Sequence, residues 1–240
     1  MHTKTRYYLL DSLRGLWILA MVAYHALWDM VNIYGVEIPW FASDMAFVVQ
    51  RTIRWGFLLL SGFCLRMGSR PLKRGLVTLG AAVVVTLVSM VAVPGSPIRF
   101  GVLTFIGTAT VLTGLLDKGM QKLHPYIGLA LSLGLFILTM EVNRGYLAGF
   151  RLPVWLYAND FTAFLGLPHP GFVSSDYVPV IPWLFAYWIG YYSYGIFLKH
   201  GWLKLLTAVR ISPLEFLGRH SLIVYMVHQP VVYAILALIF

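Results

Sequence analysis

The sequence predicts an all-α integral membrane protein, a polytopic helix bundle that forms a single domain over residues 1–240. Three observations predict this class. Of the 240 residues, 59% are hydrophobic and only 11% are charged, and the mean hydropathy is +0.77, values outside the range of soluble domains. The charged residues are spaced so that long apolar runs remain. Because a helix needs roughly 20 apolar residues to cross the hydrocarbon core, the chain has room for at most about eight crossings, and we expect about seven transmembrane helices.

We expect the seven spans at Leu13–Ile33, Asp44–Leu65, Leu76–Val93, Phe100–Leu116, Tyr126–Glu141, Val178–Leu198 and Ser221–Phe240. The first apolar stretch lacks the small-residue cleavage pattern of a signal peptide, so we expect it to be retained as a span. The segment Leu60-Ser61-Gly62-Phe63 has small residues that allow close contact between helices. The single cysteine, Cys64, cannot form a disulfide within the chain.

The positions of the basic residues predict the orientation in the membrane. Most Lys and Arg residues lie on one side of the expected spans, namely Lys4, Arg6, Arg14, Arg66, Arg70, Lys73, Arg74, Lys118, Lys122, Lys199, Lys204, Arg210 and Arg219. The positive-inside rule therefore predicts a multi-pass cell-membrane protein with a cytoplasmic N-terminus and an external C-terminus. This collar accounts for the net charge of +9 and suits lipid headgroups or a polyanionic cytoplasmic ligand better than nucleic acid.

Ionisable side chains inside the spans are the first candidates for chemistry, because hydrocarbon makes them costly. His25 lies about 16 Å along the first span from Arg14, and Asp29 is one turn further on the same face. A carboxylate at this spacing can orient an imidazole that acts as a general base. His228 in the last span is a further catalytic candidate. The alternatives are a buried His25 with a structural role, and a bridge between helices for His228 and Gln229.

Several charged residues have two interpretations each. Asp11 could cap a helix that begins at Ser12, and Arg14 could reach the lipid headgroups as an ordinary anchor. Arg54 would lie about 15 Å below Asp44 if the second span begins there, facing the interior and an anionic group. If the span begins near Arg51, both arginines are interfacial anchors.

One loop, Val142–Tyr177, is long enough to act as an external lid. Its candidates for binding a substrate are Trp155, Asp160 and Asp176, because carboxylates beside aromatic rings suit sugar hydroxyls or an amine. The alternatives are a connector without a ligand and, for Asp176, a helix N-terminal cap. No paired-cysteine or His-x-x-x-His metal spacing, nucleophile elbow or phosphate-binding glycine loop occurs, so we expect no metal.

Four motifs resemble a known family. Leu10-Asp11-Ser12-Leu13-Arg14-Gly15, followed by His25, is similar to the opening of the transmembrane acyltransferases. Three later segments resemble bacterial members of the heparan-alpha-glucosaminide N-acetyltransferase catalytic-domain family. These are Phe100–Gly107, Ser174–Pro179 with Pro182-Trp183, and Gly218–Pro230. The resemblance extends over nearly the whole chain.

This resemblance implies an enzyme that moves an acyl group, such as acetyl, from cytoplasmic acyl-CoA to a carbohydrate or other amine or hydroxyl acceptor. It implies a catalytic role for His25 and acetyl-CoA as cosubstrate. The basic groups expected to hold the CoA phosphates are Arg14, Arg66, Arg70, Lys73 and Arg74. A proton-coupled transporter, a lipid or glycan flippase, and a structural membrane subunit remain alternatives, and a homodimer is left open.

Overall fold

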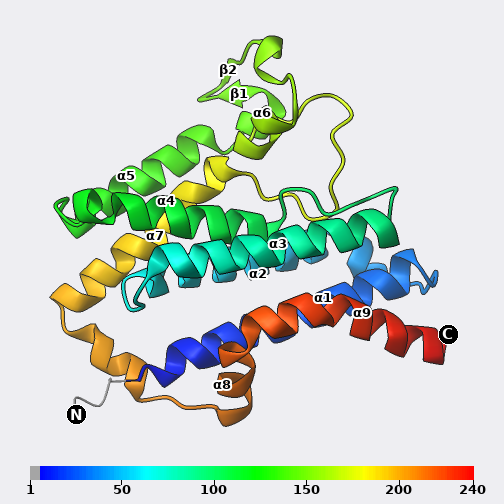
Figure 1. Ribbon diagram of the computed structural model, residues 1–240, viewed down its shortest axis with the longest axis horizontal. Helices are drawn as coiled ribbons and strands as arrows, with labels where there is room; N and C mark the ends of the chain where they lie inside the picture. Colours follow the sequence, from blue (N-terminus) through cyan, green and yellow to red (C-terminus); the bar gives the residue numbers. More distant parts are fainter. Residues whose placement is uncertain (1–5) are drawn as a thin grey trace. The chain divides into compact units, whose positions relative to one another are not determined.

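The computed structural model describes residues 6–240, and nearly all of its regular secondary structure is helical (Figure 1). The α-helices are α1 (Tyr8–Asn32), α2 (Asp44–Leu65), α3 (Pro71–Ala92), α4 (Val102–Met120), α5 (Pro125–Thr139), α6 (Asp160–Leu165), α7 (Val180–Lys199), α8 (Ser212–Arg219) and α9 (Ser221–Ile239). Short 3₁₀ helices are η1 (Pro39–Ala42), η2 (Val142–Arg144), η3 (Val154–Leu156) and η4 (Trp202–Thr207). Strands β1 (Tyr146–Leu147) and β2 (Phe150–Arg151) form a small hairpin.

Every expected span falls on a long helix, which confirms the all-α architecture. Among the described residues, the segments Pro71–Ala92, Pro125–Arg144 and Ser221–Ile239 are long and apolar enough to cross a membrane. Crossing by the other four helices stays a prediction. The first helix begins at Tyr8 with Tyr7 at its cap position, so the interpretation in which Asp11 caps a helix beginning at Ser12 is wrong. Lys4, part of the expected basic collar, lies outside the described residues.

The chain divides into two compact units. The terminal unit comprises the residues up to Leu60 together with Phe197–Phe240, and the central unit comprises Ser61–Ile196. The terminal unit thus joins segments from both ends of the chain. The expectation of one domain stays a prediction, and each unit is described by itself below.

In the terminal unit, glycines let α1 and α8 cross with their backbones in contact (Figure 1). A Cβ atom at Gly15 would lie 1.9 Å from the carbonyl oxygen of Leu214, and one at Gly218 would lie 1.8 Å from that of Asp11. Neither position has room for a side chain, as is typical of tight helix crossings. Further along α1, Ile18 packs with side chains of α2 and α9 in a small apolar core. These contacts hold α1 between α8 and α9.

In the central unit, helices also approach closely at small residues. A Cβ atom at Gly62 would lie 2.0 Å from the carbonyl oxygen of Tyr187, which confirms the predicted close contact in the last turns of α2. Gly75 of α3 lies against Gly107 of α4, where an added Cβ would be 2.9 Å from the Gly107 carbonyl oxygen. The Tyr187 hydroxyl also hydrogen-bonds Thr110 of α4 at 3.1 Å. Glycine contacts therefore hold α2 against α7 and α3 against α4, and side-chain hydrogen bonds join α4 to α7.

The segments that precede α4 and α7 are hydrogen-bonded to each other. The Ser174 hydroxyl donates to the carbonyl oxygen of Arg99 at 2.7 Å and accepts from the Arg99 N–H at 3.0 Å. The N–H of Val178 donates to the carbonyl oxygen of Phe100 at 2.9 Å. We name residues 97–102 and 174–178 the clasp. Two of the motif segments, far apart in sequence, meet in it.

Candidate functional site

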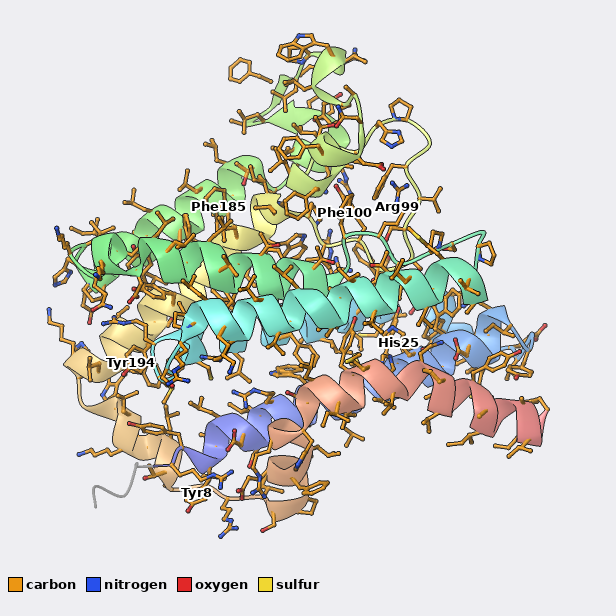
Figure 2. All side chains as sticks on the ribbon, viewed as in Figure 1. Tyr8, His25, Arg99, Phe100, Phe185 and Tyr194 are labelled. Atoms are coloured by element: carbon orange, nitrogen blue, oxygen red, sulfur yellow. The ribbon has the colours of Figure 1, made fainter. Side chains whose placement is uncertain are left out.

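The candidate catalytic histidines meet in the terminal unit. The rings of His25 on α1 and His228 on α9 are 4.9 Å apart, centroid to centroid, in an edge-to-face arrangement. Figure 2 labels His25. His228 is buried and His25 is half-buried. The two residues come from the motif segments at opposite ends of the chain. The structure therefore brings together the pair that the sequence singled out separately.

Backbone carbonyls fix the tautomer of both rings. Nδ1 of His25 lies 2.9 Å from the carbonyl oxygen of Met21, and Nδ1 of His228 lies 2.5 Å from that of Tyr225. A carbonyl oxygen can only accept, so Nδ1 carries the proton in each ring. In the neutral imidazole the lone pair is then on Nε2. His25 therefore presents Nε2 as its basic and nucleophilic atom.

Asp29 is fully buried one turn beyond His25. Its two carboxylate oxygens each accept from Nε2 of Gln229 on α9 at 2.9 Å, and its charge interacts with His25 electrostatically. The bond that orients the His25 ring comes from the Met21 carbonyl, whereas we expected it from Asp29. Gln229 therefore bridges α1 and α9, as in the alternative interpretation of His228 and Gln229 given above. Its Oε1 is buried without a hydrogen-bond partner among the described residues.

Arg54 belongs to the same unit. Helix α2 begins at Asp44, so the condition for placing Arg54 about 15 Å along the helix from Asp44 is met. Its side chain is half-buried and interacts electrostatically with the hydroxyl of Tyr24, the neighbour of His25. Arg51 is exposed and lies over the ring of Phe47 at 4.3 Å. The two arginines therefore have different surroundings.

Arg14 lies in a network of charges at the start of α1. Its Nη1 donates to Asp11 at 3.1 Å, and Arg6 also pairs with Asp11 at 3.3 Å. Glu215 of α8, which is 1% exposed, accepts from Nε of Arg210 at 2.8 Å. Sequence reasoning missed Glu215, although it is the single acidic residue between Lys199 and His220. A ligand phosphate at Arg14 would compete with Asp11.

The basic turn between α2 and α3 lies in the central unit and comprises Arg66, Arg70, Lys73 and Arg74. The guanidinium of Arg66 lies 5.5 Å from the ring centroid of Tyr191 and 5.2 Å from that of Tyr194, within cation–π distance. Arg70, Lys73 and Arg74 are exposed. The turn thus combines one arginine held between aromatic rings with three cations open to a ligand.

Arg70 and Arg74 have distinctive local surroundings in this turn. Arg70 has a left-handed backbone with φ of 55°, a conformation that costs a non-glycine residue about 1–2 kcal/mol. The guanidinium of Arg74 lies over Gly68, where a Cβ would be 2.0 Å from its Nη1. The position of Arg74 therefore depends on the absence of a side chain at residue 68.

Asp176, a candidate for binding an acceptor, lies in the clasp. One of its carboxylate oxygens accepts the N–H of Val102, the first residue of α4, at 3.0 Å. A carboxylate at this place satisfies an unpaired N–H and complements the helix dipole. Asp176 therefore contacts the N-terminus of α4, whereas the alternative interpretation placed it as a cap of the helix that it precedes, α7. Its role in binding an acceptor stays a prediction.

Asp160, the second acidic candidate, is the first residue of α6 and is half exposed. It accepts from Nε2 of His169 at 3.1 Å and forms an ion pair with Arg99 of the clasp (Figure 2). The bond from His169 and, after it, the contact with Arg99 lower the pKa of Asp160, outweighing desolvation. Trp155, the third candidate, is 74% exposed on η3. The structure brings Asp160 and Asp176 to the clasp and leaves Trp155 at the surface.

The fold and the site together define a helical membrane protein in which two ends of the chain bring a histidine pair beside a buried acid. Residues 6–230 match the profile of the family described as heparan-alpha-glucosaminide N-acetyltransferase, catalytic. The chain belongs to this family, which implies an enzyme of the acetyltransferase type. No curated protein and no solved structure matches the chain.

Proposed function

We propose that the protein transfers an acyl group, acetyl in the first instance, from acyl-CoA to an amine or hydroxyl of an acceptor, with His25 as the reacting base. The observation that carries the proposal is the Nδ1–H bond from His25 to Met21 beside His228. It leaves Nε2 of His25 unprotonated in the neutral ring, as a general base requires. Family membership supports the type of reaction.

Direct transfer of the acyl group requires one histidine, which acts as the base. Nε2 of His25 takes a proton from the acceptor amine or hydroxyl, whose nitrogen or oxygen attacks the thioester carbonyl. The carbon–sulfur bond breaks and the CoA thiolate leaves, taking up the proton that the imidazolium releases. In the covalent route, Nε2 of His25 or His228 attacks the thioester carbonyl, the carbon–sulfur bond breaks and the CoA thiolate leaves; the acceptor then attacks the acyl-imidazole, its proton passes to the thiolate and the free imidazole is restored. The products in both routes are the acylated acceptor and CoA.

Asp29 has an electrostatic role in this proposal. When His25 takes the proton it becomes an imidazolium, and a buried carboxylate nearby stabilises that positive charge. Gln229 holds the carboxylate through its two 2.9 Å contacts. Removal of the Asp29 charge should therefore slow proton transfer without removing the base.

The CoA phosphates are assigned to the cytoplasmic basic groups, Arg14 and the basic turn. This assignment depends on the orientation that the charge distribution predicts, in which the N-terminus is cytoplasmic and the C-terminus is external. Three exposed cations within five residues, Arg70, Lys73 and Arg74, favour it, because phosphates bind clustered Lys and Arg. The acceptor is assigned to the opposite side, with Arg54, Trp155, Asp160 and Asp176 as its contacts. A sugar amine or hydroxyl suits those polar groups.

The test is transfer from acetyl-CoA by purified protein in lipid nanodiscs, with glucosamine as the first acceptor. His25→Ala should abolish transfer and keep acetyl-CoA binding, whereas Asp29→Asn should lower the rate by about 10²-fold or less. His220→Ala is the matched control, since His220 bonds the carbonyl four residues before it at 2.9 Å but is exposed. A folded His25→Ala protein that transfers at the wild-type rate would refute the mechanism.

Two further measurements separate the alternatives. A transporter or flippase would neither bind acetyl-CoA nor hydrolyse it slowly to CoA in the absence of a gradient. Neutralising Arg70, Lys73 and Arg74 to Gln should weaken acetyl-CoA binding, more at low than at high salt. The control is neutralisation of Lys118 and Lys122, which are exposed cations of the same unit.

Gly68→Ala offers a finer test of the basic turn. The new methyl group would displace the Arg74 guanidinium, which lies 2.0 Å from the added Cβ, without changing any charge. Acetyl-CoA affinity should fall in this variant even though the net charge is unchanged. If it is unaffected while the triple neutralisation lowers it, the phosphate contact does not depend on the observed position of Arg74.

A further inference from the structure

Four large apolar side chains project from the segment that follows α5. Phe150 is 78% exposed, Trp155 74%, and Val154 and Phe161 69% each. We name these residues the aromatic tip. They lie on β2, η3 and α6, outside the segments that could span a membrane. A patch of this kind, outside the spanning helices, indicates a surface with a partner.

The scaffold beneath the aromatic tip is hydrogen-bonded. Leu147 pairs with Phe150 in the hairpin, and the hydroxyl of Tyr157 donates to the carbonyl oxygen of Val142 at 2.5 Å. Asn159 caps α6 and forms a capping box with Thr162. The exposed side chains are therefore presented by an ordered structure, which makes their exposure a property of the fold.

The hairpin turns back onto the end of α5 (Figure 1). The N–H of Ala148 donates to the carbonyl oxygen of Leu138 at 3.2 Å, and Leu138 lies within the apolar segment Pro125–Arg144. Ile137 and Met140 of the same helix end are more than half exposed, as expected of side chains that face lipid. The aromatic tip is therefore continuous with a lipid-facing surface at the level where the helix leaves the hydrocarbon.

The charges around the aromatic tip suit an anionic surface. Arg144 and Arg151 are both exposed, and Arg151 is paired with Tyr146 across the hairpin. Glu141 is exposed as well, and the carboxylate of Asp160 is engaged by Arg99 and His169. Near the hairpin, the two exposed positive charges of Arg144 and Arg151 therefore outnumber the one exposed negative charge of Glu141. Aromatic rings with arginines are typical of the membrane–water interface.

We propose that the aromatic tip inserts into the headgroup region of the bilayer that α5 crosses, with Arg144 and Arg151 on anionic lipid phosphates. The hairpin, η3 and α6 then lie along the membrane surface, as interfacial segments do. The proposal is independent of acyl transfer and of the predicted contact between Trp155 and an acceptor. It gives the long segment between α5 and α7 a lipid partner.

The test uses the full-length protein in phosphatidylcholine vesicles with and without phosphatidylglycerol. In a Cys64→Ser background, Phe150→Cys carries a nitroxide, and Pro170→Cys, at another exposed position of the same loop, is the matched control. Relaxation by oxygen, which partitions into lipid, is compared with relaxation by a water-soluble nickel chelate. We expect oxygen to dominate at residue 150 and nickel at residue 170.

Each other outcome overturns the proposal. Nickel access at residue 150 equal to that at residue 170 would mean that the aromatic tip faces water. Protection from both reagents would mean that it is covered by protein, for example a second copy. The double variant Arg144→Gln, Arg151→Gln should lower the preference for oxygen only when phosphatidylglycerol is present. An effect that is the same in both kinds of vesicle would contradict the proposed contacts between these arginines and lipid phosphates. These readouts need no turnover, so their failure is distinct from failure of the proposed enzyme function.

Discussion

Gln229→Leu tests whether the buried bridge between α1 and α9 supports both the fold and the reaction. The substitution removes the amide whose Nε2 lies 2.9 Å from each oxygen of Asp29 and keeps a side chain of similar size. Asp29 is fully buried, so water cannot replace the lost donor without a rearrangement. We expect a less stable protein in which the carboxylate is no longer held near His25.

The expected magnitude follows from the burial. Hydrogen bonds to a charged group contribute about 1.5–3 kcal/mol, and leaving the acceptor buried adds a desolvation penalty, so Gln229→Leu should cost about 3 kcal/mol. For a chain of this length, each kcal/mol lowers the unfolding midpoint by about 2–4 °C, which gives a fall of about 6–12 °C. Thermal unfolding of the detergent-solubilised protein, followed by tryptophan fluorescence, measures this shift.

A matched control and a double variant complete the test. Gln121 also donates to a carboxylate, that of Asp117 at 2.7 Å, but it is exposed, so Gln121→Leu should change the stability by about 0.5 kcal/mol or less. Asp29→Leu combined with Gln229→Leu should recover much of the loss, because replacing both partners by apolar groups is nearly neutral. Equal midpoints for Gln229→Leu and Gln121→Leu would refute the reasoning.

Two further predictions concern packing and pH. Gly218→Ala should lower the free energy of unfolding, measured from the thermal midpoint, by more than the ~1–3 kcal/mol typical of overpacking, because its Cβ would meet an α1 carbonyl oxygen at 1.8 Å. Gly134→Ala, with open space around it, is the control and should be neutral or stabilising. Because His169 and Arg99 lower the pKa of Asp160, the stabilisation by this carboxylate is complete above the ordinary Asp pKa of about 3.9 and is lost as the pH falls through the lowered value. The difference in stability between wild type and Asp160→Asn, at most about 1 kcal/mol for an exposed pair, should therefore shrink below pH 4, and a difference that persists there would contradict this assignment.

The long helices could be predicted from sequence because apolar runs with polar ends are a strong and local signal. The second span, Asp44–Leu65, has the same bounds in the structure. The short helix α8 and the β-hairpin could not be predicted in this way. Each is stabilised by contacts outside itself, α8 by the glycine crossing with α1 and the hairpin by the end of α5. The spacing of apolar residues within a segment does not indicate which distant segments it contacts.

In the candidate site, too, the features set by local sequence could be predicted and those set by distant contacts could not. The placement of Asp29 one turn beyond His25 follows from helix geometry and could be predicted. Its hydrogen-bond partner, Gln229, is 200 residues away, and nothing in the local pattern of either helix identifies the other. Asp176 was recognised as a possible cap, but the helix that it caps depends on the pairing of the clasp segments. Sequence reasoning thus singled out the candidate groups, and Gln229 as a possible bridge between helices, but it could not say which residue each of them contacts.

The bridge between Asp29 and Gln229 also has a consequence for biosynthesis. A membrane chain is made from its N-terminus, at about 5–20 residues per second, so α1 precedes α9 by roughly 10–40 s. During that interval the Asp29 carboxylate lacks the amide that it meets in the finished fold. A nascent chain that stalls before α9 therefore carries on its first helix a carboxylate without the amide donor of the finished fold, which costs free energy in an apolar environment.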